Sequence, residues 1–171
     1  MNKSVFIKNQ IESFKKNSIT VDGDKSISIR FVLLSSLSSG RCVATNLLES
    51  DDVLSAINIV RKLGIKVKIK NKFCEISGKG LFGLKFKKNL ILDSGNSGTT
   101  ARLICGMLAN SNFWITITGD KSLKKRDMKR IIVPIKRFGT KFKRNKTKLP
   151  ISFKGPKILK PINYTEKLGS A

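Results

Sequence analysis

The chain has 171 residues, of which 40% are hydrophobic, which suffices for one ordinary folded domain and argues against a disordered segment. Its 35 Lys and Arg residues against 11 Asp and Glu residues give a net charge of +24, which favours anionic partners: nucleic acid, a membrane surface or small phosphorylated molecules. The absence of histidine and the three scattered cysteines, without CxxC spacing, argue against a zinc site and a disulfide framework. An AT-rich coding bias would produce the same excess of lysine, so the charge alone does not choose a partner.

The beginning of the chain, "MNKSVFIKNQIESF", has no continuous apolar region, so we expect no signal peptide. No apolar stretch approaches the roughly 20 residues that span a bilayer. Together with the cysteine pattern, these features favour a cytoplasmic protein that has no membrane partner.

The first predicted elements follow the glycine turn in "GDKSISIR". Residues 26–38 indicate a helix, and the β-branched content of residues 42–48 indicates a strand. The apolar side of this helix would carry Ile27, Phe31 and Leu34.

Residues 52–68, "DVLSAINIVRKLGIKVK", indicate a second helix and then a strand. The acidic pair before it opposes the positive end of the helix dipole, and Gly64 can adopt the left-handed conformation that ends a helix. The strand alternates, so its lysines would lie on a solvated face. The predicted apolar stripe of the helix is Val53, Ile57 and Val60.

The pattern recurs with a period of 75 residues, which matches Gly23 with Gly98, Asp52 with Asp127, Gly64 with Gly139 and Gly80 with Gly155. The second copy predicts a helix over residues 99–109, a strand over 113–119 and a helix within 127–143 that Pro134 should kink or shorten at its start. Each copy reads strand, helix, strand, helix, strand, strand. We therefore predict an α/β fold with repeated βαβαββ units at about 21–95 and 96–168. A third unit would begin near position 173, which indicates a fragment.

Both glycine turns enter a helix, where free N–H groups and the helix dipole favour an anion. In the first turn, Lys25 adds a charge, Ser26 a hydroxyl and Arg30 a guanidinium that can bind a phosphate or carboxylate through two bonds. In the second, small residues would let a ligand approach the backbone near Gly98. If equivalent elements lie side by side, the basic segment that ends in Arg126 joins them around one small, multiply charged anion. Neither turn has the spacing of a Walker A loop or of a dinucleotide site.

Four motifs, in order, resemble the 5-enolpyruvylshikimate-3-phosphate synthase family and cover most of residues 20–140. They are "GDKSISIR", "LLESDDVLSAINIVRKLG", "LDSGNSGTTARLICGMLA" and "TGDKSLKKRDMKRIIVPIKRFG". The tail "PINYTEKLGSA" resembles the stretch that leads into the Ser-Ala-Gln or Ser-Ser-Gln motif of that family. The related UDP-N-acetylglucosamine enolpyruvyl transferases share the fold, but "DKSISIR" favours the shikimate enzymes.

The resemblance implies transfer of the enolpyruvyl group from phosphoenolpyruvate to the 5-hydroxyl of shikimate 3-phosphate, a step towards chorismate and the aromatic amino acids. It implies no metal or organic cofactor and a protein that is usually monomeric. It also implies two domains of three units each, with the active site between them. Residues 1–20 would then cross towards the second domain, and residues 21–171 would form an incomplete first substrate-binding domain.

Carried over by motif, the resemblance assigns a role to each candidate site residue. Lys25 would be catalytic and would contact both substrates. The other substrate-binding residues would be Ser26, Arg30 and Ser170 for shikimate 3-phosphate, and Asn96, Gly98 and Arg126 for phosphoenolpyruvate.

The chain also departs from the family pattern. Ile29 stands where the family usually has His or Asn, and Asp127, in place of proline, could weaken the hold of Arg126 on its ligand. The glutamine after Ala171 and the whole second domain, with its acid and base groups, are missing. We therefore do not expect this chain alone to turn over substrate, and a complementing C-terminal fragment would be its partner.

The alternative function is that of a basic nucleic-acid-binding protein, whose binding would fall steeply with salt. The sequence gives it little support, because only 7% of the residues are aromatic and no RNA-binding sheet motif or recognition helix is evident.

Overall fold

A computed structural model describes residues 20–158 and 160–165 of the chain. The elements of the first unit are α1 (Lys25–Ser36), β1 (Arg41–Ala44), α2 (Asp51–Lys62), β2 (Lys66–Lys70) and β3 (Phe73–Ser77). Those of the second unit are β4 (Leu90–Asp93), α3 (Gly98–Met107), β5 (Ile115–Thr118), the 3-10 turn η1 (Leu123–Lys125), α4 (Lys129–Arg137), β6 (Lys141–Phe142) and β7 (Ile151–Lys154).

The two units share one strand arrangement. In the first sheet β3 lies between β1 and β2 and is antiparallel to both. In the second sheet β7 lies in the same way between β5 and β6, while β4 adds an edge strand parallel to β5. The predicted α/β class is confirmed, and the βαβαββ order is complete in the second unit. In the first unit no strand precedes α1 within residues 20–24, and residues 1–19 lie outside the described part.

Helix α2 forms as its sequence predicts. Val53, Ile57 and Val60 are buried, and Gly64 follows the helix with a φ of 84°. Gly139 takes the same place after α4, with a φ of 101°. Helix α4 begins three residues later than the 75-residue period would place it, and it includes Pro134, so the predicted shortening of its start is confirmed.

The predicted apolar side of the first helix is wrong. Helix α1 buries Ile29, Val32 and Leu33, whereas Ile27 and Leu34 are 68% and 66% exposed. The third predicted residue, Phe31, is partly buried against the core. Both sets of residues are apolar and have helical spacing, so the packing of α1 against α2 and β3 decides which set is buried. Ile27 and Leu34 therefore form part of an apolar surface on the opposite side of α1.

The repeat also changes its spacing at the helix starts. The residues that cap α1 and α3 are Asp24 and Ser97, which are 73 positions apart, not 75. The predicted match of Gly23 with Gly98 is therefore wrong by two residues, because Gly98 is the first residue of α3 and corresponds to Lys25 in α1.

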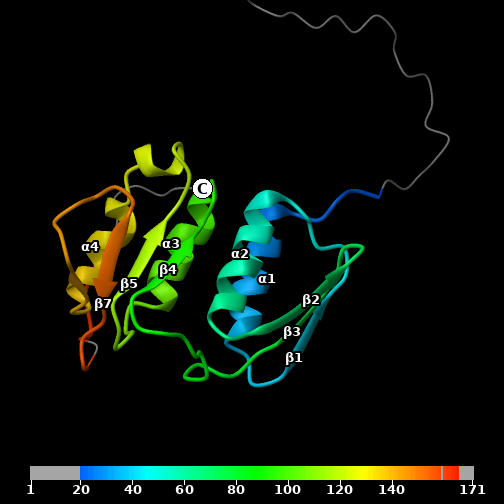
Figure 1. The fold of residues 1–171 in the computed structure, drawn as a ribbon, viewed down its shortest axis with the longest axis horizontal. Coiled ribbons are helices and arrows are strands. Elements are labelled where there is room, and N and C mark those ends of the chain that lie inside the picture. Colours follow the sequence, from blue (N-terminus) through cyan, green and yellow to red (C-terminus); the bar gives the residue numbers. More distant parts are fainter. Residues whose placement is uncertain (1–19, 159, 166–171) are drawn as a thin grey trace, which may run out of the picture.

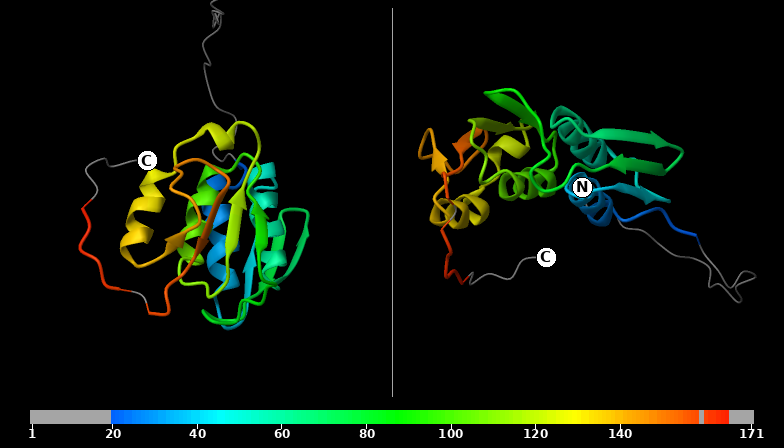
Figure 2. Two further views of the ribbon diagram at one scale, coloured as in Figure 1. Left: turned by 60° about the vertical axis from the view of Figure 1, so that its left-hand side comes forward. Right: turned by 90° about the horizontal axis from the view of Figure 1, so that it is seen from below.

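The helices of both units run in one direction. In Figure 1 the starts of α1, α2 and α3, and the turn η1, all lie at the upper end of the molecule. Helices α1 and α2 lie between the first sheet and the second unit, and Figure 2 shows α3 and α4 together on one face of the second sheet. Because the helices are parallel, the positive ends of their dipoles share this upper end.

The core joins the two units. The largest fully buried side chains include Ile57 and Ile76 from the first unit and Ile104 and Phe153 from the second. Within the described residues, no helix is both long enough and apolar enough to cross a bilayer.

Candidate functional site

The start of α1 is fixed by its own cap and by a close backbone approach. The Asp24 Oδ1 atom accepts a hydrogen bond of 2.7 Å from the Ile27 backbone N–H. A Cβ atom added at Gly23 would lie 2.0 Å from the carbonyl oxygen of Asn46, so only glycine fits between the segment before α1 and the loop after β1. The position of Lys25 therefore depends on this contact.

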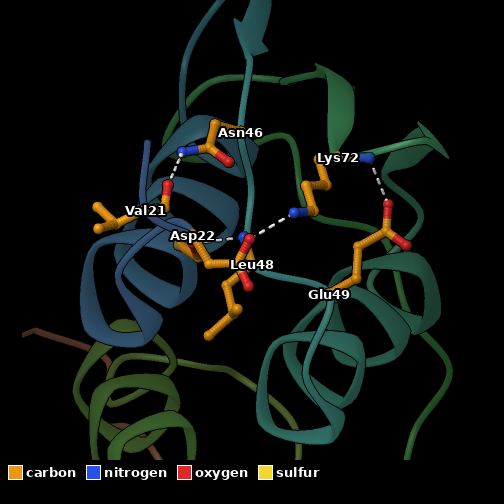
Figure 3. Close-up of polar contacts among 7 residues, drawn as sticks. Val21, Asp22, Asn46, Leu48, Glu49 and Lys72 are labelled. Carbon is orange, nitrogen blue, oxygen red and sulfur yellow. Dashed lines mark hydrogen bonds and ion pairs between the residues drawn. The ribbon is translucent and has the colours of Figure 1, made fainter. Parts of the chain in front are cut away.

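Polar contacts hold the same segment from the side of the first sheet (Figure 3). The Asn46 side-chain amide donates to the Val21 carbonyl at 3.2 Å, and the Lys72 ammonium pairs with Asp22. The Lys72 backbone N–H donates to Glu49 at 2.6 Å. The hydrogen bond to Asp22 raises the pKa of Lys72 above its ordinary value. The turn between β2 and β3 is thereby connected to the N-terminal end of α1, which we call its entrance.

The start of α3 has the same construction. The Ser97 Oγ atom accepts from the Thr100 backbone N–H at 3.2 Å. The preceding turn uses Gly95, which has a φ of 55° and donates its N–H to Asp93 Oδ1 at 2.9 Å. Gly98 is buried at the first helical position, where its backbone N–H has no acceptor within the helix.

Turn η1 brings Arg126 to this entrance. Asp120 Oδ1 accepts from the Leu123 backbone N–H at 2.6 Å, which fixes the start of the turn. The Arg126 Nη2 atom donates to Asn96 Oδ1 at 2.8 Å. The Nη1 atom of Arg126 lies 3.4 Å from the point where a Cβ of Gly98 would stand. The structure thus brings Asn96, Gly98 and Arg126 together, although they come from two separate segments.

Helix α2 connects the two entrances. The Lys25 Nζ atom lies 3.1 Å from the Asp52 Oδ2 atom, in the first turn of α2. One turn further along α2, the Ser55 Oγ atom lies 2.7 Å from the position of a Cβ on Gly95. The entrances of α1 and α3 therefore flank the same first turns of α2. A cavity of about 550 Å³ beside α2 also reaches Gly95, although Gly98 and Arg126 do not line it.

Arg102 is a further candidate site residue, which the sequence motifs did not single out. Its Nη1 atom lies 3.1 Å from the Cβ position of Gly98, so two guanidinium groups, those of Arg102 and Arg126, lie beside one glycine. Its Nε atom is buried and has no hydrogen-bond partner among the described residues. Helical spacing could have revealed Arg102, because residues four apart on a helix lie on the same face.

Two further buried polar atoms in the described part of the chain lack a partner, and both lie at helix entrances. They are Ser50 Oγ, at the residue before α2, and Ser94 Oγ, in the turn before α3. A buried hydroxyl left without a hydrogen bond costs about 1–3 kcal/mol. These entrances therefore offer unused hydrogen-bonding capacity to a polar ligand.

The remaining site residues that the sequence predicts are Ser26, Arg30 and Ser170, and each has its own position. Ser26 is partly buried in the first turn of α1. Arg30 is exposed and lines a cavity of about 300 Å³ between α1 and α3, and it forms no ion pair with any described residue. Ser170 lies outside the described residues.

The two departures from the family pattern have structural roles. Ile29 is fully buried in the core of the first unit. Asp127 accepts a hydrogen bond of 2.6 Å from the Lys129 backbone N–H at the start of α4, while Arg126 donates to Asn96. The structure thus pairs Arg126 with an amide and uses the neighbouring carboxylate to begin the next helix.

These features define an α/β protein of repeated units, in which the helix starts and two arginines gather at one end. A family model described as EPSP synthase (3-phosphoshikimate 1-carboxyvinyltransferase) matches residues 10–171. The chain therefore belongs to the EPSP synthase family.

Named relatives agree with this assignment. The chain is 42% identical over 157 residues to the 3-phosphoshikimate 1-carboxyvinyltransferase of Sulfurihydrogenibium sp. (strain YO3AOP1). This alignment covers 91% of this chain and 36% of the relative. It is also 42% identical over 156 residues to the enzyme of that name from Streptococcus mutans serotype c, covering 90% of this chain and 36% of the relative. A solved structure of EPSP synthase from Acinetobacter baumannii matches with a TM-score of 0.82 and 37% identity, covering 90% of this chain and 35% of that one.

The chain thus spans about a third of the length of the curated relatives that it matches. These comparisons give no support to the nucleic-acid-binding alternative.

Proposed function

We propose that this chain contributes residues for both substrates to an enolpyruvyl transfer site. The complete protein would transfer the enolpyruvyl group of phosphoenolpyruvate to the 5-hydroxyl of shikimate 3-phosphate. The observation that carries the proposal is the convergence of Asn96, Gly98 and Arg126 at the start of α3, beside the first turns of α2 that pair with Lys25.

In this proposal the entrance of α1 binds shikimate 3-phosphate and the entrance of α3 binds phosphoenolpyruvate. Ser26 and Arg30 would hold the first substrate, together with Ser170. Gly98 would donate its backbone N–H to the second, with Asn96 beside it, and Arg126 would pair with its anionic groups. Lys25 would contact both, as the catalytic residue.

The charges suit the chemistry of this reaction. Two anionic substrates repel each other, and fixed cations remove that repulsion while they align the hydroxyl with the enol carbon. The same cations stabilise the charge that develops on the tetrahedral intermediate and on the departing phosphate. Arg102 would add a second guanidinium beside Gly98, where the negative charge of phosphoenolpyruvate would lie.

We further propose that residues 21–171 are part of a larger substrate-binding domain. The expectation that residues 1–20 cross towards a second domain falls on residues 1–19, which lie outside the described part of the chain. The exposed apolar residues of α1 and α3 support this proposal, because an apolar surface of this kind is typically covered by further structure. These residues include Ile27, Leu34 and Leu103. The active form would then be a cytoplasmic monomer, or this chain complemented by a C-terminal fragment.

Calorimetric titration with shikimate 3-phosphate tests the assignment. Replacing Arg30 with alanine should weaken binding about tenfold or more, because charged hydrogen bonds contribute about 1.5–3 kcal/mol. Arg144→Ala is the matched control, because it removes the same charge from an exposed position between β6 and β7. Equal affinities of the two variants would contradict the proposal, as would salt-steep binding of nucleic acid without binding of shikimate 3-phosphate.

A further inference from the structure

Lys25 is the first residue of α1, and this is an electrostatically unfavourable place for a cation. The positive end of the helix dipole lies there, and a lysine ammonium at that end is repelled. The side chain is also 52% exposed, so little packing holds it. Without an ion-pair partner, the flexible side chain of Lys25 would sample many rotamers that point away from the start of α1.

Asp52 supplies the missing restraint. Its Oδ2 atom lies 3.1 Å from the Lys25 Nζ atom, and the Asp52 side chain is only 22% exposed. Asp52 lies in the first turn of α2, where a carboxylate is favoured by the dipole of its own helix. The more rigid and more buried partner of this pair thus belongs to α2, and the mobile partner is the lysine.

We infer that Asp52 is a positioning residue, which holds the Lys25 ammonium in the space between the starts of α1 and α2 and keeps it directed towards the anion. An ammonium has three N–H donors, so an ion pair with one carboxylate oxygen of Asp52 leaves donors for a ligand. The inference deepens the proposed function and rests on it, because it assumes that Lys25 contacts the substrate.

Asp51 provides a matched control. It neighbours Asp52 in the first turn of α2, carries the same charge and is exposed, but it forms no ion pair with a described residue. Asp51→Asn and Asp52→Asn therefore remove the same charge from the same helix end. Only Asp52→Asn releases Lys25, so a comparison of the two variants cancels the general electrostatic effect.

The first measurement follows Lys25 without any substrate. A trace amount of an acetylating reagent is added to the folded 171-residue chain, and the acetylation rate of Lys25 is determined by peptide mass spectrometry relative to the exposed Lys157. Because a carboxylate-bound ammonium is less available to the reagent, Asp52→Asn should raise the relative rate about threefold, as expected for a weak exposed pair. Asp51→Asn should leave it unchanged. Equal rates in the two variants would overturn the inference.

The second measurement is the affinity for phosphoenolpyruvate in the presence of shikimate 3-phosphate. Asp52→Asn should bind about threefold more weakly than Asp51→Asn, and Asp52→Glu should restore part of the loss. In a Lys25→Met background the two Asn variants should bind equally, because Asp52 acts only through the lysine. A difference that persists in this background would refute a positioning role.

The two measurements separate the inference from the proposed function. If the acetylation rates differ as expected but no variant binds phosphoenolpyruvate, Asp52 still positions Lys25 and the proposed function fails. If the unsubstituted chain binds the ligand but neither rate nor affinity distinguishes Asp52→Asn from Asp51→Asn, the proposed function survives and the inference fails.

Discussion

Replacing Gly23 with alanine should destabilise the protein, although this glycine has an ordinary φ and lies on no regular element. The new methyl group would stand 2.0 Å from the Asn46 carbonyl oxygen and 3.1 Å from the Leu48 backbone nitrogen. Both are backbone atoms, so neither can rotate away as a side chain would. Relief requires a movement of the segment before α1 or of the loop after β1, and overpacking of this kind costs about 1–3 kcal/mol.

For a chain of this length, that cost corresponds to a fall in melting temperature of roughly 2–12 °C. Urea unfolding followed by circular dichroism should show a lower midpoint with an unchanged slope. Gly40→Ala is the control, because nothing lies within 4 Å of its added Cβ, and we expect a change within about 0.5 kcal/mol. If the two variants proved equally stable, the close contact between Gly23 and the Asn46 carbonyl would not constrain the start of α1.

Two further predictions concern titratable groups. Burial raises the pKa of the Cys74 thiol to about 11 and that of the Cys105 thiol to about 12, whereas Cys42 is only partly buried. A thiol reagent should therefore modify Cys42 in the folded protein, and Cys74 and Cys105 only after unfolding. Rapid modification of all three without denaturant would contradict the described core. The hydrogen bond from Lys68, aided by the charge of Arg41, holds the pKa of the Glu75 carboxyl below its ordinary value. The stability that Glu75 contributes is therefore fully present above the ordinary pKa and is lost as the pH falls through the lowered pKa. The stability difference between the unsubstituted chain and Glu75→Gln, measured by urea unfolding, should therefore shrink between pH 7 and acidic pH, and a difference that grows on acidification would be inconsistent with these ion pairs.

Much of the fold follows from local signals in the sequence. The stripe of Val53, Ile57 and Val60 and the left-handed Gly64 are features of one helix and its end, so a period of 3.6 residues and one glycine suffice to predict them. The 75-residue repeat predicts a helix of the same kind, followed by Gly139, at α4. The apolar side of α1 could not be chosen in this way, because Ile27 and Leu34 have the same spacing as the residues that are buried. Tertiary packing decides between two equivalent stripes.

The candidate site is predictable in its parts but not in its contacts. Motif order places Asn96, Gly98 and Arg126 in one family pattern, and the structure brings them together. The sequence explains Asp52 only as a favourable charge at a helix start, because nothing local indicates that Lys25 of another helix lies 3.1 Å away. Such a pair depends on how α1 packs against α2.

In the proposed site, phosphoenolpyruvate bound at the start of α3 also contacts Lys25 at the start of α1, and a single NMR titration tests this contact most directly. Phosphoenolpyruvate is added to the ¹⁵N-labelled chain in the presence of shikimate 3-phosphate, and the backbone amide signals of Lys25, Gly98 and Arg126 are followed. We predict that all three signals move with one dissociation constant. Shifts confined to one entrance, or different constants at the two, would contradict the account.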